Sequence, residues 1–461
     1  MNPTTLIRKI APARAALFAL AAFASLGTAI AGPDIQHWTA PTGARVFFVE
    51  SHALPLVDVQ VTFAAGGALD PVGAAGVASL TRSLLDAGTE SLNEQQIAER
   101  IADTGARIGG GTDKDMASLS VRTLSSEAER EAAIGLAARL LAKPTFPAEI
   151  LERERARSIA GLRDALTRPD TLAARSFTRA IYGDHPYGRL VTVESLRRIK
   201  RDQIKAFHQA HYTALAASVA IVGDVSRDQA ERIAVRLTEA LPAGTPPAPL
   251  PPPQLPPRLI EHIEHPSAQA HILMGMPGIS RDDPDYFPLV VGNYVLGGGG
   301  FVSRLTKEVR EKRGFAYSVF SSFQPQRVAG PFEIGLQTRG SQAKEAGQVT
   351  QTVLDEFIAA GPTAEELQAA KDNLINGFGL RLDSNRKILD YVAMIGFYGL
   401  PLDWLDTYPE RVAEVTVEAV RDAFSRRIRD EHLVTVVAGG DGDVVANGGE
   451  RVPAAKAEPS N

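Results

Sequence analysis

Apolar and polar residues alternate over two short stretches, one in each half of the chain. The first is residues 57–63 (VDVQVTF) and the second is residues 270–276 (AHILMGM). Alternation of this kind is typical of a β-strand with one buried face. Each stretch precedes an Asp-Pro turn, at 70–71 and 283–284, and then a segment with the apolar spacing of a helix. The same order of elements therefore occurs twice.

The later elements repeat as well. Helices with an acidic start are expected over 147–166 and 363–382, and the second opens with the capping sequence TAEE from Thr363. Strands rich in β-branched residues are expected over 218–222 and 433–437. Strands flanked by long helices in this order predict an α+β fold made of two copies of one layered domain, as gene duplication would produce.

A proline-rich segment separates the two halves. Residues 242–257 read PAGTPPAPLPPPQLPP, a composition that excludes helix and sheet and favours an extended spacer. We therefore expect an N-terminal domain over 35–241 and a C-terminal domain over 258–440. The Gly-, Ala- and Pro-rich residues 441–461 are expected to form a flexible tail.

The first 31 residues have the pattern of a signal peptide. Three basic residues precede the apolar run 15–26, and Ala29-Ile30-Ala31 resembles a cleavage site. A membrane anchor is the alternative, but the run is shorter than the roughly 20 residues that span a bilayer. We expect cleavage after Ala31 and a periplasmic protein with no membrane segment thereafter.

Composition narrows the possible chemistry. The 461 residues include 49 Lys and Arg, 54 Asp and Glu, and no Cys. A formal charge of −5 gives no electrostatic reason to expect nucleic-acid binding. The lack of Cys excludes disulfides, thiolate metal ligands and a Cys nucleophile. A metal site built from His, Asp and Glu remains possible.

The helix expected after the first Asp-Pro turn, residues 76–89 (GVASLTRSLLDAGT), carries a family resemblance. It resembles the insulinase/pitrilysin family of zinc peptidases, the inverted zincins, whose signature on this helix is H-x-x-E-H. Ser79 and Ser83 stand at the two His positions, and Arg82 stands at the Glu position. Serine hydroxyls are poor zinc ligands, and a guanidinium cannot act as a general base.

The third metal ligand that the resemblance implies is absent too. The family places it in a pair of Glu residues on the later helix, and this chain has Ala160 and Gly161 there. Other histidines offer no clear substitute. His208 and His211 are three residues apart on an expected helix, but no acidic third ligand lies nearby in sequence. We therefore expect no metal in this chain.

The second half keeps a feature that the resemblance assigns to substrate binding. Arg310 and Tyr317 have the spacing of an Arg/Tyr pair that holds the substrate carbonyl near the scissile bond. Such a pair supplies hydrogen-bond donors to a developing oxyanion. The alternative is a helix-to-strand junction, with Arg310 on the surface and Tyr317 packed against its neighbours.

Two glycine-rich segments are also informative. Gly297–Gly300 completes neither a Walker motif nor G-x-G-x-x-G, so a conformational role is favoured over phosphate binding. Residues 104–123 contain two strand-like segments around Gly109–Gly111. The resemblance places the substrate-binding edge strand here, and the glycines make a normal edge doubtful.

The resemblance covers residues 35–440 and implies two homologous domains, each an antiparallel sheet with helices packed on it. It also implies a non-catalytic subunit of a periplasmic heterodimeric zinc peptidase. A homologous partner would hold zinc, this chain would contribute the Arg/Tyr pair, and the substrates would be unstructured peptides. Alone, the chain would be inactive. The alternative is a non-enzymatic peptide-binding or scaffold protein with the same fold.

Overall fold

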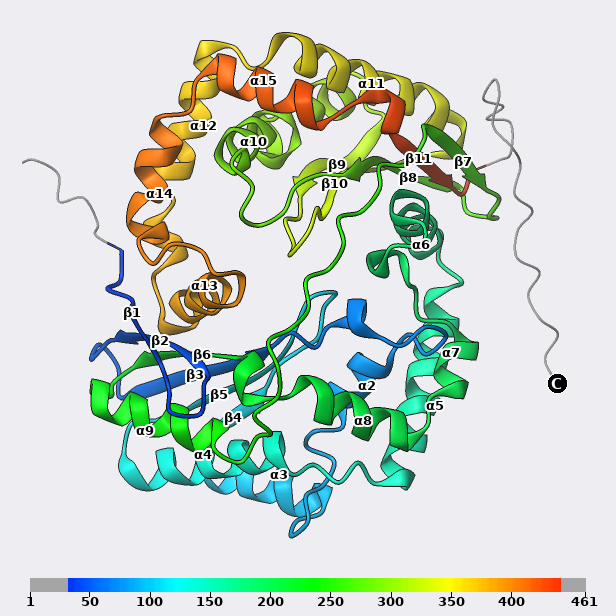
Figure 1. Ribbon diagram of the computed structural model, residues 1–461. Coiled ribbons are helices and arrows are strands. Elements are labelled where there is room, and N and C mark those ends of the chain that lie inside the picture. Colours follow the sequence, from blue (N-terminus) through cyan, green and yellow to red (C-terminus); the bar gives the residue numbers. More distant parts are fainter. Residues whose placement is uncertain (1–31, 441–461) are drawn as a thin grey trace, which may run out of the picture.

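The computed structural model describes residues 32–440, and its strands form two sheets, one in each half of the chain (Figure 1). The predicted signal peptide and C-terminal tail lie outside these residues. The first sheet has the order β1-β2-β6-β3-β5-β4. Its strands are β1 (Gln36–Thr39), β2 (Arg45–Glu50), β3 (Leu56–Phe63), β4 (Arg107–Gly109), β5 (Ala117–Leu124) and β6 (Ala217–Gly223).

The second sheet repeats the first, apart from β1. Its order is β7-β11-β8-β10-β9, and its strands are β7 (Leu259–Ile263), β8 (Gln269–Pro277), β9 (Ala316–Phe323), β10 (Pro331–Arg339) and β11 (Val434–Ala438). In the first half, the last strand β6 pairs in parallel with β2, and in the second half, the last strand β11 pairs in parallel with β7. The other pairings among the repeated strands are antiparallel. The repeated α+β domain predicted from the sequence is confirmed.

Helices cover both sheets. Those of the first half are α2 (Val77–Ser83), α3 (Glu94–Asp103), α4 (Glu127–Ala142), α5 (Ala148–Ala165), α6 (Pro169–Tyr182), α7 (Val193–Arg198), α8 (Arg201–His211) and α9 (Arg227–Thr238). Those of the second half are α10 (Tyr286–Asn293), α11 (Ala343–Ala360), α12 (Ala364–Asn376), α13 (Asn385–Tyr398), α14 (Trp404–Ala413) and α15 (Val417–Arg427). No described helix is long and apolar enough to cross a membrane.

The two halves exchange one helix each. Helix α6 packs on β8 and β11 of the second sheet, and α13 packs on β2, β3 and β6 of the first (Figure 1). Gly396 of α13 makes this approach possible, because a Cβ there would lie 2.5 Å from the ring of Phe47 in β2. The boundaries 35–241 and 258–440 therefore separate the two sheets but not the helices that cover them.

The proline-rich residues 242–257 form no helix or strand and run between the halves (Figure 1).

A buried carboxylate also connects the two halves. Asp115, from the loop between β4 and β5, accepts hydrogen bonds from the hydroxyls of Tyr187 and Tyr398 and from the backbone N–H of Arg327. This carboxylate therefore joins the first half to two segments of the second.

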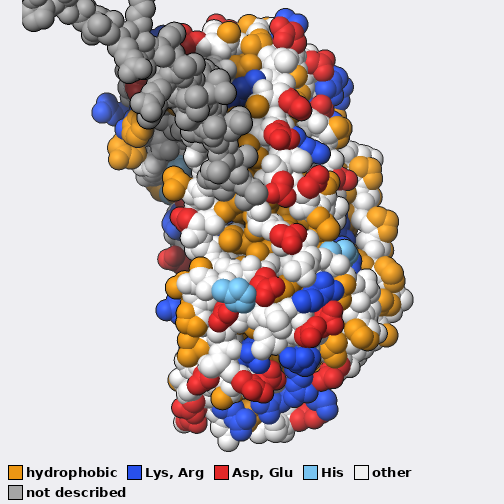
Figure 2. Space-filling view, turned by 90° about the vertical axis from the view of Figure 1, so that its left-hand side faces the viewer, with side chains coloured by type: hydrophobic (Ala, Val, Ile, Leu, Met, Phe, Trp, Pro, Cys, Tyr) orange, Lys and Arg blue, Asp and Glu red, His pale blue; other side chains and the backbone are white. Residues whose placement is uncertain are grey.

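One outer face of the molecule is chemically mixed. Figure 2 shows acidic, basic and hydrophobic side chains interspersed on that face. A mixed surface of this kind does not create the single-signed field that steers a highly charged partner.

Candidate functional site

Helix α2, which carries the altered zinc motif, begins at a point fixed by Asp70. The carboxylate of Asp70 accepts hydrogen bonds from the backbone N–H groups of Gly76 and Ala78, each at 2.7 Å. A negative charge at this position also complements the positive end of the helix dipole. Burial raises the pKa of Asp70, and the two hydrogen bonds oppose that change. The segment that follows is thus held in a defined orientation.

Ser79 and Ser83 lie one helical turn apart on α2, and both are exposed. The hydroxyl of Ser83 donates a hydrogen bond to the carbonyl oxygen of Leu80, 3.1 Å away. These residues occupy the positions where the sequence resemblance places two zinc-binding histidines. Their neutral hydroxyls belong to none of the ligand types that zinc prefers.

Arg82 turns into the protein instead. Its side chain is only 9% exposed, and its Nε donates a hydrogen bond to the carbonyl oxygen of Ser118 in β5. Burial lowers the pKa of Arg82, but a guanidinium remains protonated in proteins. A fixed cation therefore occupies the position where the resemblance places a general base.

The helix that should supply the third ligand supplies none. Ala160 and Gly161 are exposed on α5, which packs beside α2. Across residues 32–440, no three His, Asp or Glu side chains gather closely enough to hold a metal ion. Two hydroxyls and a buried guanidinium are not a zinc-binding donor set, so the residues present do not fit this metal.

The two histidines of α8 do not form a metal site either. His208 is buried, donates a hydrogen bond to the carbonyl oxygen of Leu141 at 2.8 Å, and stacks on the ring of Tyr212. The ring of His211 lies at a tilted angle to that of Phe207 on the same helix, with 4.4 Å between the ring centres. Burial lowers the pKa of both histidines. His208 is thus part of the protein core.

The second half brings Arg310 and Tyr317 together. Arg310 lies in the π-helical segment Thr306–Glu311, and Tyr317 is the second residue of β9. The guanidinium carbon of Arg310 is 5.2 Å from the centre of the Tyr317 ring, close enough for a cation–π contact. Tyr317 is 83% exposed, so its hydroxyl faces solvent. The packed tyrosine of the alternative interpretation is not what the structure shows.

A third residue belongs to this group and was not identified from the sequence. Phe301 is 68% exposed, and its ring centre lies 4.9 Å from the guanidinium carbon of Arg310. The two rings restrict where the guanidinium can lie, but they leave its N–H groups free to donate. The available signal was a lone Phe directly after four glycines, because a large apolar residue in an exposed loop requires an explanation.

The glycines before Phe301 have separate conformational roles. A Cβ at Gly297 would lie 2.4 Å from the backbone nitrogen of Ser321 in β9, so only glycine allows this close approach. Gly300 has a φ of +60°, in the left-handed region that glycine adopts readily. The predicted conformational role is supported at both positions. The loop is thereby held against the strand that carries Tyr317.

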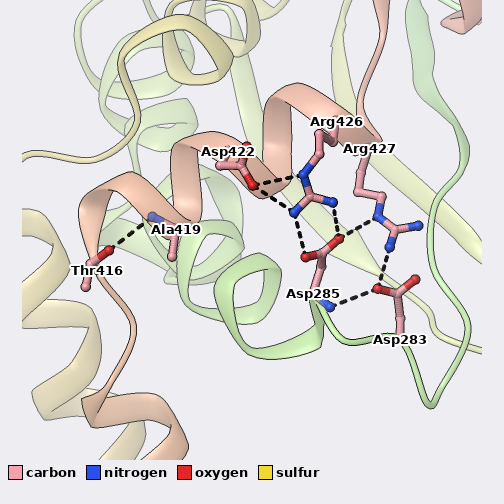
Figure 3. Close-up of polar contacts among 7 residues, drawn as sticks. All are labelled: Asp283, Asp285, Thr416, Ala419, Asp422, Arg426 and Arg427. Atoms are coloured by element: carbon pink, nitrogen blue, oxygen red, sulfur yellow. Dashed lines mark hydrogen bonds and ion pairs between the residues drawn. The ribbon is translucent and has the colours of Figure 1, made fainter.

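A network of ion pairs fixes the helix that leads into this loop (Figure 3). Asp285, at the start of α10, accepts hydrogen bonds from Arg426 and Arg427 of α15 at 2.7–2.8 Å. Arg427 also donates to Asp283, and Arg426 to Asp422, each at 2.8 Å. Because α10 continues through the π-helical turn Tyr294–Gly298 to Phe301, this network helps to position Phe301 and Arg310.

The edge strands of the two sheets differ in length. In the first sheet the outermost strand β4 has three residues and ends at Gly109, close to the Ser118–Arg82 contact. In the second sheet the outermost strand β9 has eight residues and carries Tyr317 near its start. The second sheet thus has the longer edge strand at this end, and that strand carries Tyr317 beside Arg310.

Comparison with known proteins places this geometry in a family. Residues 45–193 match the family model described as insulinase (peptidase family M16), and residues 198–374 match that of the peptidase M16 inactive domain. A crystal structure described as a peptidase M16 inactive domain from Pseudomonas fluorescens is 40% identical, covers 88% of this chain and 98% of that chain, and superposes with a TM-score of 0.86. The chain belongs to the M16 peptidase family. The resemblance predicted from the sequence is confirmed.

M16 relatives carry names of two kinds. The non-peptidase homolog YmxG of Helicobacter pylori is 26% identical over 380 residues, which cover 82% of this chain and 87% of the relative. An uncharacterized zinc protease of Mycobacterium leprae is also 26% identical, over 408 residues that cover 87% and 91%. With Ser79, Arg82 and Ser83 in its altered motif, the chain is a peptidase-like M16 protein of the inactive type.

Proposed function

We propose that this M16 protein is the non-catalytic subunit of a heterodimeric zinc peptidase and supplies Arg310 and Tyr317 to a zinc-binding partner. The observation that carries the proposal is the approach of the Arg310 guanidinium to the exposed Tyr317 ring. The other half of the chain supports it, because Arg82 takes the place of a general base in α2. In this proposal, the chain has kept the Arg/Tyr pair that binds the substrate carbonyl and has lost the zinc ligands and the general base.

The chemistry of amide hydrolysis explains why such a subunit would be needed. Attack on a peptide carbonyl places negative charge on its oxygen, and donors already in position stabilise that charge. The N–H groups of Arg310 and the O–H group of Tyr317 are suitable donors. In this proposal the partner holds zinc and activates water, while this chain binds the carbonyl from the opposite side.

The eight-residue edge strand β9 supports a peptide substrate. An extended peptide can add to a sheet edge through backbone hydrogen bonds, which requires no particular side-chain sequence. The edge lies directly beside Tyr317. We therefore propose unstructured peptides as the substrates.

The basic, apolar and A-x-A pattern of residues 1–31 supports a periplasmic location. Secreted, unfolded peptides would then be available as substrates.

The experiment is a peptidase assay with a quenched, unstructured peptide. This chain, an M16 partner with an intact H-x-x-E-H motif, and their mixture are each assayed with and without a chelator. We expect chelator-sensitive cleavage in the mixture only. Arg310→Ala or Tyr317→Phe should lower its rate by about 10²–10³-fold, the usual effect of removing an oxyanion donor.

Arg313→Ala is the matched control. Arg313 lies one turn from Arg310 and pairs with Glu308 at 2.8 Å, so its loss should leave the rate unchanged. Full activity from the partner alone, or no association of the two chains, would contradict the proposal and favour a peptide-binding scaffold. Chelator-sensitive cleavage by this chain alone would contradict our interpretation of Ser79, Arg82 and Ser83.

A further inference from the structure

A cavity of about 560 Å³ lies where the two halves and the proline-rich linker meet. Its linker wall includes Pro246, Pro247 and Pro249. The linker passes between the two halves (Figure 1). Proline lacks a backbone N–H, so these residues offer no amide donor to a ligand. The remaining walls must supply the polar contacts.

Three arginines from separate segments line this cavity. Arg45 begins β2, Arg281 follows β8, and Arg327 lies in the loop between β9 and β10. The cavity has one acidic lining residue, Asp282, whose Oδ1 accepts a hydrogen bond from Ser280. Its lining groups therefore carry an excess of two positive charges.

The three half-buried arginines of the cavity have no acidic partner: within residues 32–440, none of them forms an ion pair with a carboxylate. By contrast, Arg426 and Arg427 on α15 both pair with Asp285. Burial lowers the pKa of Arg45, and the positive charge of Arg327 adds to that effect. Like charges held together in this way favour the binding of an anion.

Aromatic rings hold two of the guanidiniums in place. The guanidinium carbon of Arg327 lies 4.7 Å from the centre of the Phe397 ring, and that of Arg281 lies 5.3 Å from Tyr398. A guanidinium stacked on a ring keeps its in-plane N–H groups available. The Nε of Arg281 is buried and has no hydrogen-bond partner among the described residues. A buried donor left without an acceptor is costly.

We propose that this cavity binds a small organic or inorganic oxyanion with two negative charges, such as a phosphate group or a dicarboxylate. Two charges match the excess on the lining arginines, and the volume is in the usual range for small-molecule sites. Because the walls come from both halves and from the linker, the bound anion would join them. The site is separate from Arg310 and Tyr317, so the proposal does not depend on the proposed peptidase role.

The test is titration calorimetry on the full chain with inorganic phosphate and with succinate, at constant ionic strength set with sodium chloride. We expect saturable one-site binding of at least one of them. Arg281→Gln and Arg327→Gln should each weaken that binding at least tenfold. The preferred anion identifies the ligand class, and either preference supports the site.

Arg227→Gln is the matched control, because Arg227 also stacks on a ring, 3.5 Å from the centre of Trp38, but lies outside the cavity. It should bind the anion as the unaltered chain does. Arg45→Gln, on a different segment, should repeat the tenfold loss if either of the other variants fails to fold. No saturable binding of either anion, or equal affinity in cavity and control variants, would overturn the proposal.

Discussion

Gly110 is the residue on which the packing of Arg82 depends. It has a φ of +133°, and a Cβ there would lie 2.1 Å from the carbonyl oxygen of Ser118 and 2.7 Å from Nη2 of Arg82. We expect Gly110→Ala to lower the free energy of unfolding by about 1–3 kcal/mol, measured by chemical denaturation. Gly109→Ala is the control, since its nearest contact would be an ordinary 3.8 Å. Equal losses in the two variants would contradict this account.

His208 should make the protein sensitive to acid. Burial lowers its pKa in the folded state, so the unfolded chain binds a proton first as the pH falls. Its contribution to stability is therefore present above about pH 6.5 and is lost below it. We expect the melting temperature to fall between about pH 7.5 and about pH 5, and to fall less in His208→Gln. Glutamine can still donate to the carbonyl of Leu141.

His52 provides the control for this pH effect. Hydrogen bonds to Asp224 and Glu50 raise its pKa, so its contribution is present at low pH and is lost as the pH rises through the raised value. The melting temperature of a His52 variant should therefore still fall on acidification. If His52→Gln removed that loss as fully as His208→Gln, the assignment to His208 would be wrong.

At the level of single residues, the chemical type of each site residue could be predicted from the sequence, but its contacts in the folded protein could not. The chemical properties of Ser79, Arg82 and Ser83 follow from their identity alone, so their unsuitability for zinc could be predicted. The contact of Arg82 with Ser118 joins residues 36 positions apart and depends on the fold. Phe301 was missed for the same reason, because its role depends on the position of Arg310.

Among the elements, the ion pairs between α10 and α15 give the clearest prediction. Asp285 is almost fully buried and pairs with two arginines, whereas Asp422 is exposed and pairs with one of them. We expect Asp285→Ala to lower the free energy of unfolding by about 1.5–3 kcal/mol, because two partly exposed arginines lose a charged hydrogen-bond partner that they share. Asp422→Ala should cost less than about 1 kcal/mol, as exposed ion pairs do.

Denaturant unfolding of both variants measures the difference. If the two variants lost the same free energy of unfolding, the proposal that this ion-pair network positions α10 would be contradicted. In the mixed peptidase assay, Asp285→Ala should also lower the rate while Asp422→Ala leaves it unchanged. The reason is that α10 leads, through the π-helical turn Tyr294–Gly298, to Phe301.

The boundaries of elements were predictable where the local signals were strong. The strand expected over 270–276 lies within β8, and the capping sequence at Thr363 forms the expected reciprocal hydrogen bonds with Glu366. The helix expected over 363–382 was too long, because α12 ends at Asn376, directly before Gly377. The π-helical turn that carries Arg310 has no comparable local signal.

At the scale of the whole molecule, the repeat was visible in the sequence but the exchange of helices was not. Periodicity shows that α6 and α13 each have an apolar face, but it does not show which sheet that face covers. The choice is made by contacts far apart in sequence, such as Gly396 against Phe47 and Phe177 near Val434. The two halves are consequently interdependent.

This interdependence gives a prediction for separated halves. Without α13, residues 32–241 would expose the apolar face that β2, β3 and β6 present to that helix, and large exposed apolar surfaces cause association. We expect this fragment to aggregate when produced alone and to form a soluble complex when produced with residues 258–440. Near-ultraviolet circular dichroism and size-exclusion chromatography would follow the outcome. A monomeric fragment with a cooperative unfolding transition would show instead that each half folds independently and that the exchanged helices add later.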